Sequence, residues 1–143
     1  MRFMMLMIPK VYQGNNGKSL SEDFAPGADD VAKMTKYNED LAKSGALISL
    51  DGLQPLTKGA RVSFPKGKPT VTDGPYTESK EVLGGYWMIQ VKSKQEAVEW
   101  ARRIPAQDGD IVEVRQVFEM TDFPADVQKA AESSTVRAEL KKH

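Results

Sequence analysis

The sequence predicts an α+β protein with a ferredoxin-like sandwich and an inserted β-hairpin. Strand patterns and two amphipathic helical patterns follow one another in the order strand, helix, strand, hairpin, strand, helix, strand. The chain has 143 residues, 40% of them hydrophobic, which is the size of one globular domain with its own core. We therefore expect one sheet with both helices on the same face.

The first strand, residues 2–8, is apolar on both of its sides. One side carries Phe3, Met5 and Met7, and the other carries Met4, Leu6 and Ile8. A strand of this kind is covered on both faces. Because the two helices can shield only one face, a monomer would leave a hydrophobic patch in water. We therefore expect a homodimer formed through the helix-free face.

The next segments alternate between loop, helix and strand. The polar, turn-rich residues 11–27 predict a mobile loop that could act as a lid. Residues 29–44 have apolar side chains at helical spacing and end at Gly45, a residue typical of helix C-caps. Residues 46–50 then predict a strand. Residues 60–64 and 70–72 flank a five-residue connection with two prolines, which indicates an exposed hairpin.

The second half of the chain repeats the pattern. Residues 86–91 alternate as a strand, and Ser93 with Glu96 forms a capping box that starts a helix ended by Pro105. Residues 111–120 predict the last strand, with Phe118 on its apolar face. Residues 121–143 contain helix formers but few apolar positions, so we expect a tail with a docked or partly frayed helix, separate from a domain of residues 1–120.

Composition excludes several classes of function. Twenty basic and twenty acidic residues cancel, so no broad field would recruit nucleic acid or anionic lipid. No cysteine is present and His143 is the single histidine, which excludes thiolate zinc sites and Ser-His or Cys-His catalysis. No segment approaches the roughly 20 apolar residues of a membrane span. We expect a soluble, cytoplasmic protein with no metal, no cofactor and no nucleic-acid or membrane partner.

Residues 70–87, TVTDGPYTESKEVLGGYW, concentrate turn formers and a lone acid between two strand patterns. With the downstream runs EAVEWARRIP and IVEVRQV, this segment resembles the DGPF-domain branch of the YCII-related proteins, and Tyr76 stands where the motif has Phe. The resemblance extends from the first strand to about Phe118. It implies a dimeric α/β barrel, in which two sheets face each other, with a pocket beside the motif residues.

Some YCII-related proteins look like enzymes with a His-Asp dyad. Aligning the GALI end of the first helix places Met34 at the expected histidine, and aligning residues 100–105 places Ile104 at the expected aspartate. Both halves of that dyad are therefore absent from this chain. The acid pairs Asp29-Asp30 and Asp108-x-Asp110 could meet a hard cation, although solvation in loops explains them more simply.

Asp73 is the leading candidate for chemistry. A Gly-Pro turn would hold this acid at a strand end, where it could act as a general base or bind a ligand cation. The alternative is an Asx-turn that only shapes the backbone. Glu113 and Arg115 lie two apart on the last strand and point to the same face, so they are candidates for orienting a polar ligand or for a structural ion pair.

Four further residues are ligand-binding candidates because they flank the motif or the neighbouring strands. These are Lys80, Glu81, Gln54 and Tyr86. Simple surface charge is the alternative for Lys80 and Glu81, and a turn role is the alternative for Gln54. The pair Gly84-Gly85 lacks the spacing of a phosphate-binding loop and predicts a bulge or a close backbone approach.

Two functions follow from these patterns. The first is an enzyme-like protein that binds a small organic molecule in a pocket formed with the dimer partner, with cofactor-independent isomerase, lyase or oxygenase-like chemistry suggested by fold analogy. The second is a non-catalytic ligand-binding or regulatory protein, since DGPF-type proteins look like frequent neighbours of extracytoplasmic-function sigma factors. The chain has no helix-turn-helix pattern and no basic stripe, so such regulation would use protein contacts.

Overall fold

The structure is a computed structural model that describes residues 1–13, 25–74 and 81–142. Six strands and four helices are present in these ranges. The strands are β1 (Arg2–Ile8), β2 (Leu47–Gly52), β3 (Ala60–Ser63), β4 (Thr70–Asp73), β5 (Gly85–Gln90) and β6 (Ile111–Gln116). The helices are α1 (Ala28–Lys43), α2 (Lys94–Arg102), α3 (Ala125–Ala130) and α4 (Ser134–Leu140).

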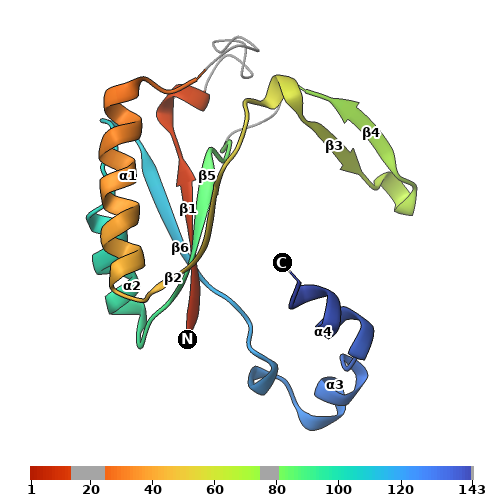
Figure 1. The fold of residues 1–143 in the computed structure, drawn as a ribbon. Coiled ribbons are helices and arrows are strands. Elements are labelled where there is room, and N and C mark those ends of the chain that lie inside the picture. The colour runs from red at the N-terminus through yellow and green to blue at the C-terminus, as the bar shows by residue number, and fades with distance from the viewer. Residues whose placement is uncertain (14–24, 75–80, 143) are drawn as a thin grey trace.

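Four strands form one antiparallel sheet in the order β2-β5-β1-β6, and β3 pairs with β4 in a separate two-stranded ribbon. Helices α1 and α2 both cover one face of the sheet (Figure 1). The α+β prediction is confirmed, as is the hairpin inserted between the second and third strands of the sheet. Within the described residues the sheet is open, with β2 and β6 at its edges, and no closed barrel is formed by one chain.

The core lies between the sheet and the two helices. Its fully buried side chains are Phe3, Met5, Leu41 and Ile89, which come from β1, α1 and β5. Alternation places Phe3, Met5 and Ile89 on one face of the sheet, and the structure shows that the helices cover this face. Trp87 extends the core, and its indole N–H donates to Asn38 Oδ1 at 2.8 Å, so the buried nitrogen is satisfied.

Local signals set the ends of both covering helices. Ser93 caps α2 by accepting from the Glu96 backbone N–H, which confirms the predicted helix start. The Glu96 carboxylate accepts from the backbone N–H of Lys92, one residue before the position that a capping box uses. Gly45 follows α1 with φ of 84°, a conformation that L side chains rarely adopt. These devices fix where the chain returns to the sheet.

The helix-free face of the sheet combines apolar and polar side chains. Register places Tyr86, Leu6 and Glu113 in one row across three strands, and Met88, Met4 and Arg115 in the next. The apolar members Met4, Leu6 and Met88 are half-buried. They form the centre of the face, with polar groups on both sides.

Two expectations about strand ends and loops need correction. The last strand ends at Gln116 instead of residue 120, and Phe118 is 71% exposed and stacks on Phe123 at a centroid distance of 5.0 Å. Beyond the pairing of Phe3 with Gln116, β6 has almost no β1 left to pair with. Lys10–Tyr12, expected in a loop, form a 3-10 turn, η1, whose Tyr12 is buried. The expected lid falls largely on residues 14–24, outside the described residues.

Candidate functional site

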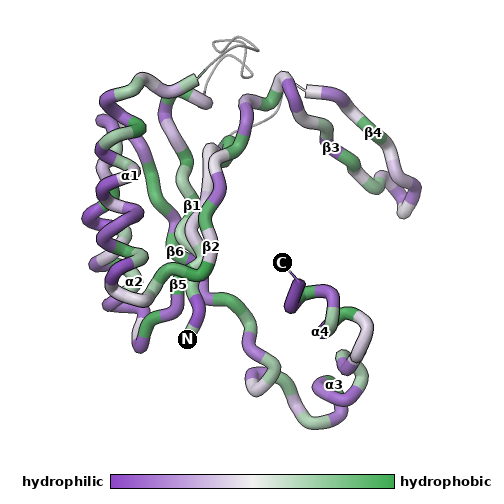
Figure 2. The backbone as a smooth tube through the Cα atoms, in the orientation of Figure 1, coloured by the Kyte–Doolittle hydropathy of each residue, from purple (hydrophilic) through white to green (hydrophobic). Residues whose placement is uncertain are grey.

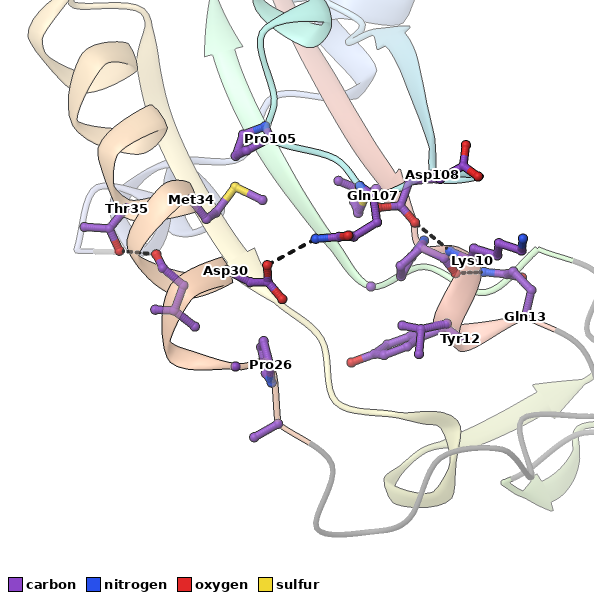
Figure 3. Close-up of a pocket in the computed structure, with 18 of the residues that line it drawn as sticks. Lys10, Tyr12, Gln13, Pro26, Asp30, Met34, Thr35, Pro105, Gln107 and Asp108 are labelled. Carbon is purple, nitrogen blue, oxygen red and sulfur yellow. Dashed lines mark hydrogen bonds between the residues drawn. The ribbon is translucent and has the colours of Figure 1, made fainter.

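A cavity of about 890 Å³ opens between the end of β1 with η1, the first turns of α1 and the loop that follows α2. Figure 3 shows side chains from these three segments around the same space. Pockets for small molecules typically have volumes of about 300–1,000 Å³. Apolar lining residues include Met7, Val11, Tyr12, Val31 and Met34, and polar ones include Lys10, Gln13, Asp30, Asn38, Gln107, Asp108 and Asp110.

The η1 wall of the cavity is fixed by side-chain hydrogen bonds. The Gln13 amide nitrogen donates to the carbonyls of Pro9 and Val82, both at 2.8 Å, and its oxygen accepts from the Val82 backbone N–H at 2.8 Å. The Tyr12 hydroxyl donates to the Leu53 carbonyl at 2.8 Å. Burial raises the pKa of Tyr12, so its hydroxyl stays protonated and keeps this role as donor.

Asp110 joins η1 to the loop that follows α2. Its two carboxylate oxygens accept from the backbone N–H groups of Lys10 and Gln107, each at 2.8 Å. The neighbouring Gly109 has φ of 88°, and the Lys10 side chain occupies the place where a Cβ would lie. Both oxygens are thus used within the protein, and Asp110 is a structural group of the cavity wall.

Asp30 and Asn38 are the α1 side chains that offer polar groups to the cavity. Asp30 Oδ1 accepts from the Gln107 side-chain amide at 3.1 Å, and Figure 3 shows the two side chains facing each other. Asn38 Oδ1 is committed to the Trp87 indole, which leaves its amide nitrogen as a donor for a bound molecule. The cavity thus combines apolar walls with a carboxylate acceptor and an amide donor, which is the usual composition of a small-molecule site.

The structure places Asp73 away from this cavity. Asp73 is exposed at the end of β4, opposite Ala60 of β3. The following Gly74 donates its backbone N–H to the Gly59 carbonyl at 2.9 Å, and a Cβ at this position would overlap the Leu56 carbonyl. Close backbone approach, not positive φ, is therefore what requires glycine after Asp73. The remainder of the expected DGP turn lies outside the described residues.

Glu113, Arg115 and Tyr86 share the helix-free face of the sheet. Arg115 donates to Glu113 at 3.3 Å, so the expected pairing along β6 is present. The Tyr86 hydroxyl donates to Asp51 at 2.7 Å, and this hydrogen bond is the main reason why the pKa of Tyr86 is raised. β1 lies between β5, which carries Tyr86, and β6, which carries Glu113 and Arg115. Two strand spacings therefore separate the backbones of Tyr86 and Glu113, a distance of about 10 Å.

Gln54 and Glu81 line a second hollow of about 420 Å³, between the segment that joins β2 to β3 and residues 81–83. Its walls also contain Lys58 and Arg61. Lys80 lies outside the described residues. The structure therefore divides the predicted site residues among three places, and none of those it describes lines the larger cavity.

Comparison with known proteins identifies the family. The sequence profile of the YCII-related domain matches residues 1–121. The chain belongs to the YCII-related family. A protein of Rhizobium meliloti (strain 1021) named "Uncharacterized protein R00369" is 36% identical over 84 residues, a match that spans 59% of this chain and 64% of that protein. The chain thus matches less than two thirds of this relative's length.

One of the two positions aligned with the expected dyad lines the cavity of this YCII-related domain, and the other lies in its core. Met34, aligned with the expected histidine, lines the cavity, and its sulfur-bearing side chain points into it in Figure 3. Ile104, aligned with the expected aspartate, is buried in the core, while the next residue, Pro105, lines the cavity. Apolar groups thus occupy the dyad positions. In the described residues, no cluster of three His, Cys, Asp or Glu side chains is placed to hold a metal ion.

Sequence reasoning missed most of the cavity in this YCII-related protein. Tyr12 and Asn38 carried no signal, because each lies in an ordinary loop or helix pattern. Asp30 and Asp110 stood out as members of acid pairs, but only folding shows that one contacts Gln107 and the other secures the loop. The described residues also contain no helix with the length and apolar character needed to cross a membrane.

Proposed function

We propose that this YCII-related protein binds a small organic molecule in the cavity between η1, α1 and the loop that follows α2. The observation that carries the proposal is the cavity itself: about 890 Å³, with apolar walls and a few polar groups that converge on it. An apolar body on the ligand suits Met7, Val31 and Met34. A hydrogen-bond donor on it suits Asp30, and an acceptor suits the Asn38 amide.

Catalysis at this site would use carboxylate chemistry. Asp30 and Asp108 are the carboxylates that line the cavity without a structural role of the kind Asp110 has. A cofactor-independent isomerisation or elimination fits this inventory. The non-catalytic alternative, a ligand-binding regulator, uses the same cavity without turnover, so a bound ligand that emerges chemically unchanged favours it.

We further propose that two copies form a dimer through the helix-free faces of their sheets, as in a dimeric α/β barrel. The half-buried Met4, Leu6 and Met88 support this arrangement, because a second sheet would remove them from water. Glu113 with Arg115 and Tyr86 with Asp51 would then lie in the space between the sheets, where they could orient a polar ligand.

A blocking substitution tests the binding proposal. We expect a fragment library screened by ligand-observed NMR to yield molecules that bind the wild type, lose binding in Met34→Trp, and keep it in Val98→Trp. Val98 is exposed on α2 and does not line the cavity, so the second variant adds the same ring elsewhere. If every fragment that binds also binds Met34→Trp equally well, the cavity is not the ligand site.

Asp30→Asn then tests the chemistry of the site. The substitution keeps the size of the side chain and an oxygen for Gln107, but removes the charge. Fragments with a hydrogen-bond donor or a positive charge should bind at least threefold more weakly, a loss of roughly 0.7 kcal/mol. Unchanged affinity for such fragments would remove Asp30 from the site.

A further inference from the structure

Two segments leave the sheet on its helix-free side and have almost no cover. The first is the hairpin arm, residues 60–73, and the second is the tail arm, residues 118–142 (Figure 1). Every residue of β3 and β4 is exposed, and no residue of α3 or α4 is buried. A two-stranded ribbon and helices of six or seven residues are marginally stable in water unless they pack on another surface.

The hairpin arm carries an apolar stripe on one face. Val62 and Val71 are directly opposite each other, and Phe64 lies just beyond the end of β3, two residues after Val62. These three side chains are 51%, 66% and 65% exposed, respectively. The sheet of the same chain does not cover them, so the stripe lacks a partner within the described structure.

The tail arm carries a matching set of apolar positions. Phe118, Val127, Val136 and Leu140 are 71%, 41%, 56% and 71% exposed. Figure 2 shows hydrophobic positions along both arms, and the two arms lie apart in that view. Within one chain the stripe and the tail therefore do not shield each other.

The two arms also have opposite charge. The hairpin arm contains Arg61, Lys66, Lys68 and Asp73, so three positive charges and one negative give +2. The tail arm as a whole, residues 118–142, has five negative and four positive charges, a net of −1. Its negative charge is concentrated in residues 120–132, where Asp122, Asp126 and Glu132 against Lys129 give −2, while residues 133–142 give +2. Complementary charge of this kind steers and orients an association.

We propose that the hairpin arm of one copy packs on the tail arm of a second copy. One chain carries both complementary surfaces, so a two-fold axis makes the same contact twice and closes the assembly. The apolar stripe of Val62, Phe64 and Val71 then meets the apolar side of α3 and α4. This inference specifies contacts within the proposed dimer, and does not depend on what the cavity binds.

Cross-linking locates the contact, because the natural chain has no cysteine. Val71→Cys protein and isotope-labelled Val136→Cys protein are mixed and treated with a short bismaleimide. The expected product is the mixed hairpin-to-tail dimer, resolved by mass. Val98→Cys, on the far side of α2, is the control and should link to neither. A Val71→Cys, Val136→Cys double variant that links within one chain at high dilution would overturn the proposal.

Charge exchange tests the energetics in the full-length chain. Asp126→Asn with Glu132→Lys changes residues 120–132 from −2 to +1, and we expect the dimer Kd at low salt to rise about tenfold. Adding Lys66→Gln and Lys68→Glu changes the hairpin arm from +2 to −1 and should restore the Kd to within about threefold. Sedimentation velocity measures both.

The outcomes separate the two proposals. A wild-type dimer that the tail substitutions leave unchanged and that gives no hairpin-to-tail cross-link overturns the arm contact, while the sheet-face dimer stands. A wild-type chain that stays monomeric at every accessible concentration overturns both.

Discussion

Replacing Asp110 with Ala should loosen the wall of the cavity and lower the free energy of unfolding by an amount that can be worked out from its hydrogen bonds. The substitution removes two hydrogen bonds, from the backbone N–H groups of Lys10 and Gln107, each 2.8 Å long. A hydrogen bond to a charged group contributes about 1.5–3 kcal/mol. Because both bonds are exposed to solvent, water replaces part of each, and we expect a total loss of about 2 kcal/mol.

Asp108→Ala provides a matched control in the same loop. Asp108 is exposed and makes no hydrogen bond within the described part of the chain, so its removal should change stability by less than about 0.5 kcal/mol. Asp110→Asn should fall between the two, because an amide offers one oxygen where the carboxylate offers two.

Urea unfolding followed by tryptophan fluorescence measures these differences, since Trp87 is buried in the core. A loss of about 2 kcal/mol corresponds to a fall in Tm of roughly 6 °C for a chain of this size. If Asp110→Ala and Asp108→Ala are equally stable, Asp110 does not secure the loop, and the account of the cavity wall is wrong.

Three other substitutions have equally specific outcomes. Met5→Asp should unfold the protein, because Met5 is 0% exposed and an unpaired buried charge is costly, while Val98→Asp on exposed α2 should remain folded in circular dichroism. The Arg2 guanidinium lowers the pKa of Glu119 through a hydrogen bond. The pair therefore contributes stability above the unfolded pKa of Glu119, and this contribution is lost as the pH falls through the lower folded pKa. Glu119→Gln should make the stability of the protein depend less on pH in this acidic range. Asp73→Asn should keep stability within about 1 kcal/mol because the side chain is exposed, and should leave ligand affinity unchanged because Asp73 does not line the cavity; a tenfold loss of affinity would contradict the placement of the ligand there.

The fold was predictable where neighbouring residues carry the signal. Alternation along β1 and β5 identifies both segments as strands and divides their side chains between two faces. Because β1 is apolar on both sides, only the structure shows that Phe3 and Met5 face the helices. The Ser93 cap acts within one helical turn, so its residues are adjacent in sequence. Such signals depend on the period of a strand or helix, which local sequence sets directly.

The ends of elements were less predictable, because they depend on distant partners. Phe118 continues the apolar alternation of the last strand, yet the ladder stops at Gln116, opposite Phe3 near the start of β1. The Arg2–Glu119 ion pair at 2.8 Å holds Glu119 beside the start of β1, and the chain leaves the sheet after this point. Pattern alone cannot report where a neighbouring strand runs out.

By itself, the sequence determined the order of strands and helices along the chain, the apolar side of each covering helix and the membership of the family. Only the tertiary structure decided where a ligand site can form, because that depends on residues remote in the chain: Asp30 meets Gln107 across 77 positions, and Lys10 meets Asp110 across 100. Periodicity is a property of a few consecutive residues. A cavity forms between segments that folding brings together, so its lining residues share no local repeat from which the sequence could predict it.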